Sequence, residues 1–196
     1  MKWTTELAPV NDERHARAVG SHDATVNGFD SARIQAADQV VERVDIGSGQ
    51  SLFGLARRAG LDDQTAEDVV QETLVRLWLE IRSGTEILDP PAWSFRTLYR
   101  IAMDQHRLRR RVRELVERIG RRPPPTSTDI VQQLTVWSVV DRLPLRQRQV
   151  MYLRYRADMT FEEIALVMAI TPSGARAHAA KAKASLRRSF GSSLVD

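Results

Sequence analysis

Seven arginines crowd one segment of the chain and alternate there with aromatic residues. They are Arg96, Arg100, Arg107, Arg109, Arg110, Arg111 and Arg113. Guanidinium groups bind phosphates, and exposed rings can stack on unpaired bases. Trp93 and Phe95 stand where the apolar stripe of a helix begins, so we expect them in the core, whereas Tyr99 and the arginines are candidates for nucleic-acid contact. The alternative is a solvated helix end whose positive charge favours the helix dipole.

A second basic group lies near the end of the chain. Thr160 and Glu163 have the spacing of a capping box, and Thr171 with Pro172 predicts the start of one more helix. Two short helices separated by a tight turn fit a helix-turn-helix, whose second helix enters the major groove. The basic candidates on that helix are Arg176, His178, Lys181 and Lys183. The alternative is a solvated amphipathic helix, because such short patterns are not specific.

No pattern in the sequence predicts catalysis. The chain has no cysteine, its four histidines have no ligand-like spacing, and neither a Ser-His-Asp order nor a phosphate-binding glycine loop is present. The acidic residues between positions 63 and 72 have no histidine near them and are typical of a solvated helix face. We therefore predict that the protein is not an enzyme and that it has no metal site and no cofactor.

The net charge of +4 is unevenly distributed. Residues 1–50 and 51–89 carry −3 and −4, whereas residues 90–122 and 123–196 carry +7 and +4. A polyanion is therefore the expected partner of the second half. The first residues lack the pattern of a secretory signal, and no stretch is long and apolar enough to insert into a membrane, so we expect a cytoplasmic protein.

Apolar residues recur at three- and four-residue intervals and predict an all-α fold. Residues 1–29 are predicted to form a mobile tail. A helix should then end at the Gly47-Ser48-Gly49 run, a separate helix should cover residues 52–59, and a longer one should follow the caps Asp62 and Asp63. Consecutive prolines at 123–125 predict a flexible linker over residues 118–131. It divides the chain into two small helical domains, residues 30–117 and 132–190, and residues 191–196 form a second tail.

Two groups of motifs resemble the extracytoplasmic-function class of bacterial RNA polymerase sigma factors. Residues 66–73, residues 91–96 and the arginine-rich end near Asp104 are similar to the second sigma domain. Residues 143–150, 153–155, 161–165 and 170–173 are similar to the fourth. The two matches occur in the family's order and together cover about residues 30–190, which makes them far more specific than a helix-turn-helix alone.

The resemblance implies a sigma factor that binds core RNA polymerase and directs promoter-specific initiation by recognising and melting promoter DNA. Asp68, Gln71 and Glu72 would dock on the coiled coil of the largest-subunit clamp, the linker would run towards the RNA exit channel, and the β flap would be a further contact. Residues 83–91 and the basic helix would engage the minus-ten element, through Arg96, Tyr99, Arg100, Asp104, Arg107, Arg109 and Arg110. The minus-thirty-five element would be read by Ser173, Arg176, His178, Lys181 and Lys183.

Two alternatives stay open at this point. The first is a stand-alone helix-turn-helix regulator, against which the acidic helix at residues 63–72 argues, because an independent DNA binder does not need it. The second is a sigma mimic that sequesters an anti-sigma protein and binds no promoter. The many alanines of the last helix favour that interpretation, and the intact arginine run argues against it.

Overall fold

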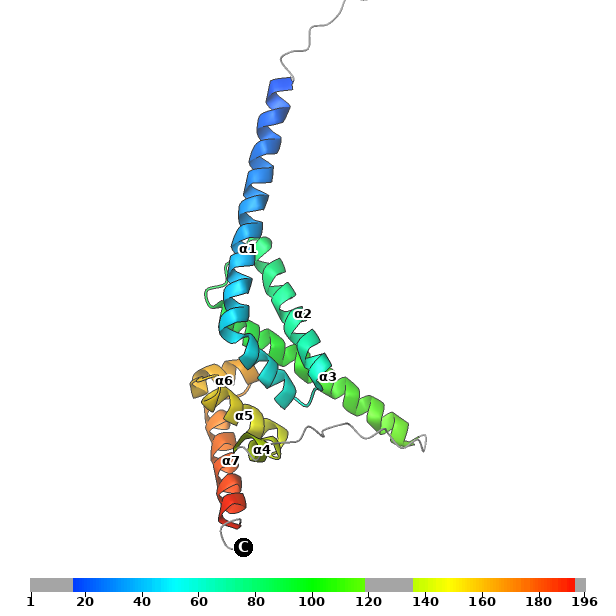
Figure 1. Cartoon of the computed structure of the whole chain (residues 1–196), viewed down its shortest axis with the longest axis vertical. Helices are drawn as coiled ribbons and strands as arrows, with labels where there is room; N and C mark the ends of the chain where they lie inside the picture. The colour runs from blue at the N-terminus through cyan, green and yellow to red at the C-terminus, as the bar shows by residue number, and fades with distance from the viewer. Residues whose placement is uncertain (1–15, 119–135, 193–196) are drawn as a thin grey trace, which may run out of the picture.

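The computed structural model describes residues 16–118 and 136–192 (Figure 1). Within these ranges the chain forms seven α-helices and no strand, which confirms the predicted all-α class. The helices are α1 (Ala16–Arg58), α2 (Asp63–Arg82), α3 (Pro90–Arg118), α4 (Val136–Asp141), α5 (Leu145–Tyr155), α6 (Phe161–Met168) and α7 (Pro172–Ser192). The predicted linker lies outside the described residues, apart from Arg118 at the end of α3.

The first helix corrects two expectations. Residues 16–29, expected in a mobile tail, are the start of α1, and the Gly47-Ser48-Gly49 run does not interrupt it. A glycine inside a helix costs only about 1 kcal/mol relative to alanine, and packing can offset that cost. Val44, Leu52 and Leu55, on either side of the run, are all buried against the core and keep one helix in register. Figure 1 shows α1 extending well beyond α2 at its amino end.

The predicted helix starts are confirmed by their hydrogen bonds. Asp62 caps α2 by accepting from the Thr65 amide at 2.8 Å. Thr160 and Glu163 form a complete capping box on α6. Thr171 accepts from the Gly174 amide at 3.1 Å at the start of α7. Ala169 ends α6 in the left-handed conformation, with φ of 51°, and so sets the tight turn that separates α6 from α7.

One hydrophobic core serves both halves of the chain. Helices α1, α2 and α3 pack together, as do α5, α6 and α7, but α1 also contacts α5 and α3 contacts α6. The main cluster accordingly joins Leu55, Leu98 and Met103 of the first half to Leu153 and Ile164 of the second. A smaller cluster of Val140, Leu143, Met151 and Ala182 belongs to the second half alone. The two halves of the chain thus pack face to face.

Arg58, near the end of α1, connects the halves on one side of this core. Its guanidinium carbon lies 4.4 Å from the ring centre of Tyr152 and 5.2 Å from that of Trp137. Its Nε lies 3.2 Å from an Asp141 carboxylate oxygen, and the charge is largely shielded from water, so the ion pair and the two cation–π contacts reinforce each other. The Tyr152 ring packs directly against Gly54, where α1 has no side chain.

Two glycines of α1 provide a test of this packing. A Cβ at Gly54 would collide with the Tyr152 hydroxyl group, whereas a Cβ at Gly47 would meet nothing within 4 Å. We expect Gly47→Ala to raise the free energy of unfolding by about 0.5–1 kcal/mol, as a helix-interior glycine replacement should. Gly54→Ala should lower it, because the gain in helix propensity is outweighed by the displaced ring. Denaturant unfolding of both variants measures the difference, and equal stabilisation by both would contradict the packing of α5 on α1.

Candidate nucleic-acid interface

The acidic face of α2 points to solvent. Asp68, Gln71 and Glu72 are all exposed, as a surface that docks on another protein requires. Asp68 accepts a hydrogen bond from Gln64 at 3.2 Å, and Glu72 forms an ion pair with Arg76 at 2.5 Å. These contacts are made within one helix face, so the structure brings the three predicted residues together and leaves them accessible.

Two apolar residues extend the same face and were missed in the sequence. Val75 and Leu79 are 55% and 51% exposed, and they follow Asp68, Gln71 and Glu72 at helical spacing. Their position in the sequence could have indicated this exposure, because both fall outside the apolar stripe that contains the buried Leu74 and Leu77. Asp68, Gln71, Glu72, Val75 and Leu79 therefore form a strip on α2 in which acidic, amide and apolar side chains are all exposed.

The basic helix α3 presents one of its faces to the second half of the chain. Arg96, Arg100, Asp104 and Arg107 share that face, and with Trp93 and Tyr99 they line a cavity of about 680 Å³ whose other wall is the end of α6. Arg107 pairs with Asp104 at 2.9 Å. Arg96 and Arg100 are exposed and have no ion-pair partner among the described residues. Their charge is available to a phosphate.

The position of Tyr99 differs from the one predicted from the sequence. Tyr99 was expected to be exposed for contact with bases, but only 6% of it is exposed. Its hydroxyl donates to Gln149 at 3.5 Å and accepts from Arg146 at 3.1 Å, and both partners lie on α5. Burial raises the pKa of the Tyr99 phenol, against the opposing effect of the Arg146 charge. In this arrangement the second half covers the ring, because the apolar side of α3 that α1 and α2 leave open is closed by α5 and α6.

The remaining arginines of the predicted set lie elsewhere on α3. Arg109 reaches the start of α2, where it pairs with Asp62 at 2.7 Å and also donates to the Thr65 hydroxyl. Hydrogen bonds from the Thr65 amide and then from its side chain, followed by the hydrogen bond and charge of Arg109, hold the pKa of Asp62 well below its usual range. Arg110 pairs with Glu114 at 2.8 Å on the exposed distal part of the helix. The structure therefore assigns Arg109 to holding α3 against α2, apart from the face of Arg96 and Arg100.

The predicted side chains of the helix-turn-helix lie along α7. Ser173, Arg176, Lys181 and Lys183 are exposed, whereas His178 is half-buried. Arg176 pairs with Glu162 of α6 at 3.0 Å, and the Lys183 ammonium lies 5.5 Å from the centre of the Tyr155 ring. Burial, followed by the positive charges of Arg146 and Lys181, lowers the pKa of His178 and so favours its neutral form.

The alanines of α7 divide by position. Ala175, Ala179 and Ala182 are buried, and their small side chains let α7 approach α5 and α6 closely. Ala177, Ala180 and Ala184 are exposed. Packing thus explains three of the six alanines of α7, and the other three are exposed, as Lys181 and Lys183 are.

Comparisons with known families identify the two halves of the chain. The family models for sigma-70 region 2 and for sigma-70 region 4 match residues 48–114 and 133–186, more than half of the chain taken together. The chain belongs to the sigma-70 family. This pair of regions is typical of extracytoplasmic-function sigma factors, which confirms the resemblance, and the protein is a sigma factor that directs transcription initiation. The sigma-70 family is not a family of enzymes.

Two solved structures are similar to this sigma factor in fold. The structure of CnrH in complex with the cytosolic domain of CnrY is 21% identical, with a TM-score of 0.55 over 84% of this chain and 96% of that one. The sigma factor RpoE in complex with the anti-sigma factor NepR from Bartonella quintana is 20% identical, with a TM-score of 0.54 over 79% and 93%. The comparison with curated protein sequences finds no match. No described helix is long and apolar enough to cross a bilayer.

Proposed function

We propose that this sigma factor divides its work among three helices. The strip on α2 docks on the clamp coiled coil of core polymerase, α3 engages the minus-ten element, and α7 reads the minus-thirty-five element. The observation that carries this proposal is the separation of charge: the acidic, partly apolar face of α2 is distinct from the basic faces of α3 and α7. One chain can then bind a protein through its acidic face and DNA through its basic faces at the same time. The chemistry itself belongs to the polymerase.

The buried Tyr99 supports a further step in this function. A base flipped from the duplex needs an accessible ring or pocket to offset the few kcal/mol of unpairing. With α5 and α6 on α3, the ring faces Gln149 and Arg146 instead. We therefore propose that the described arrangement is a closed state and that the halves separate when polymerase and promoter bind. Binding then selects the open state because only that state makes Tyr99 accessible together with the exposed basic side chains of α3 and α7.

We also propose that the sigma factor acts in the cytoplasm and is held by an anti-sigma protein. Both similar structures are complexes, one with the cytosolic domain of CnrY and the other with the anti-sigma factor NepR. The exposed apolar residues that flank the polar faces, such as Val75 and Leu166, support a partner that covers them.

The direct test is initiation from a panel of promoter DNAs with core polymerase, with and without the sigma factor. Specific transcripts only from the combination are expected, together with weak binding of the free chain to the same DNAs. Tight specific binding of DNA without polymerase would instead identify a stand-alone regulator. Core binding without any transcript would identify a mimic.

The α2 strip generates the first prediction from this function. Asp68→Ala with Gln71→Ala should weaken binding to core polymerase about tenfold, because the centre of the strip then offers the clamp two polar groups fewer. Gln39→Ala with Glu42→Ala, which removes the same kinds of group from exposed positions of α1, is the control and should bind normally. Competition binding to core measures both. An affinity unchanged from the wild type for the first pair would remove α2 from the docking surface.

The exposed lysines of α7 generate the second prediction. Lys181→Ala with Lys183→Ala should reduce promoter-directed initiation. The slope of log affinity for the promoter against log salt concentration should also become shallower, by about one for each phosphate that α7 no longer neutralises. Arg33→Ala with Arg43→Ala removes the same charge from α1 and should leave both readings unchanged. Equal effects of the two pairs would show that only net charge matters and that α7 makes no defined contact.

A further inference from the structure

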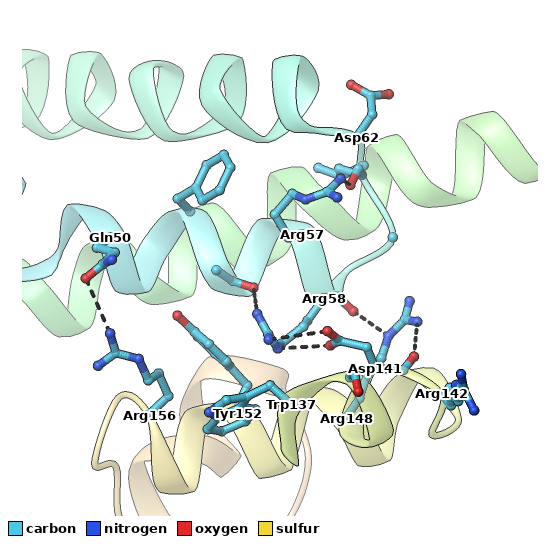
Figure 2. Close-up of a pocket in the computed structure, with 15 residues that line it drawn as sticks. Gln50, Arg57, Arg58, Asp62, Trp137, Asp141, Arg142, Arg148, Tyr152 and Arg156 are labelled. Carbon is cyan, nitrogen blue, oxygen red and sulfur yellow. Dashed lines mark hydrogen bonds and ion pairs between the residues drawn. The ribbon is translucent and has the colours of Figure 1, made fainter. Parts of the chain in front are cut away.

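A cavity between the two halves carries an inference beyond transcription initiation. It has a volume of about 790 Å³ and lies between the end of α1, the start of α2 and helices α4 and α5 (Figure 2). This is the size of typical small-molecule sites, which run from about 300 to 1,000 Å³. Phe53, Trp137 and Tyr152 supply aromatic wall, so the space is neither wholly polar nor a simple water channel.

Positive charge dominates the lining of this cavity, because five arginines border it against only two carboxylates. Both carboxylates are already paired, Asp141 with Arg58 and Asp62 with an arginine outside the lining. Arg57 is matched by Asp63 at 2.6 Å. The other three arginines are Arg142, Arg148 and Arg156. None of them has a carboxylate within ion-pair distance among the described residues.

Two of these three arginines donate to neutral partners. Arg148 donates to the backbone carbonyls of Arg58 and Asp141, at 2.9 and 3.2 Å. Arg156 donates to the side-chain amide oxygen of Gln50 at 3.3 Å. Arg142 is exposed, and Figure 2 shows it at the opposite end of the view from Arg156, on the side of Arg148. Burial, with the nearby charge of Arg58, lowers the pKa of Arg148, although Asp141 opposes the effect. A partly buried guanidinium that has only neutral partners is stabilised when an anion enters the cavity.

We propose that this cavity binds a small polyphosphate-bearing molecule of about the size of a nucleotide. Arg142 and Arg148, which lie towards the same end of the cavity in Figure 2, would take the phosphate oxygens, since the guanidinium fork suits phosphate. The aromatic wall would contact the flat part of the ligand, and Arg156, at the other end beside Gln50, would face its far end. A neutral or singly charged ligand would leave most of the positive charge unmatched. An acidic peptide would also carry negative charge. Competition between such a peptide and ATP distinguishes the two kinds of ligand.

The position of the cavity gives such a ligand an effect on the whole molecule. Phe53, Arg57 and Arg58 come from α1, whereas the arginines that would hold the ligand come from the second half. A ligand that contacts both walls binds the packed arrangement better than the separated one and therefore favours it. The inference does not depend on the assigned transcription function, because binding can be measured on the free chain.

The test uses the full-length protein and ATP without divalent cations, titrated in a calorimeter at physiological ionic strength. We expect saturable binding at one site per chain. Arg142→Ala with Arg156→Ala should weaken it at least about tenfold, as removal of one or more charge-assisted hydrogen bonds should. Both residues lie at exposed positions, so folding should be retained, and the far-ultraviolet circular dichroism of the variant checks this.

Arg33→Ala with Arg43→Ala is the control for net charge and should bind ATP as the wild type does. Absence of saturable binding by the wild type at millimolar ATP would overturn the proposal. So would an equal loss of affinity in the control pair, because binding would then be a general response to positive charge. Displacement of ATP by an acidic peptide of equal charge, with the tighter affinity on the peptide's side, would overturn it too and assign the cavity to a protein partner.

Discussion

The packing of the second half against α1 and α3 is the contact on which the rest of the molecule depends. It buries Tyr99, Gln149 and Leu153 in a core that neither half completes alone. Apolar residues exposed on the facing sides of two small helical units would otherwise remain in water, at a cost of roughly 25 cal/mol per Å². Arg58, which contacts Trp137, Tyr152 and Asp141, fixes the relative position of the halves at the edge of that core.

This contact separates the faces of the sigma factor into two kinds. The strip on α2 and the outer side of α7 are exposed while the halves are packed, so they are accessible to polymerase and DNA from the start. The face of α3 with Tyr99 is covered by α5 and α6. Under the proposed function docking can therefore precede melting, and the covered face provides a physical reason why the free chain should not open promoter DNA by itself.

Local features were predictable from the sequence because they depend on near neighbours. The capping box of Thr160 and Glu163, the Asp62 cap and the basic α7 follow from spacing alone. The continuity of α1 through Gly47 and Gly49 did not, since tertiary packing outweighed glycine propensity there. The burial of Tyr99 could not be predicted from the sequence either, because Gln149 on α5 is 50 positions away and no local pattern indicates the contact. The cavity between the halves could not be predicted for the same reason, because it is formed by residues that are far apart in the sequence.

A reversible cross-link between the halves tests the closed state most directly. The chain has no cysteine, and Gln50 and Arg156 are exposed residues of opposite halves whose side chains touch at 3.3 Å. Gln50→Cys with Arg156→Cys, joined by a short thiol-specific linker that reductant cleaves, should abolish promoter-specific initiation by core polymerase. Cleavage of the linker should restore it. Undiminished initiation by the cross-linked protein would contradict the account, because it would show that the halves need not separate.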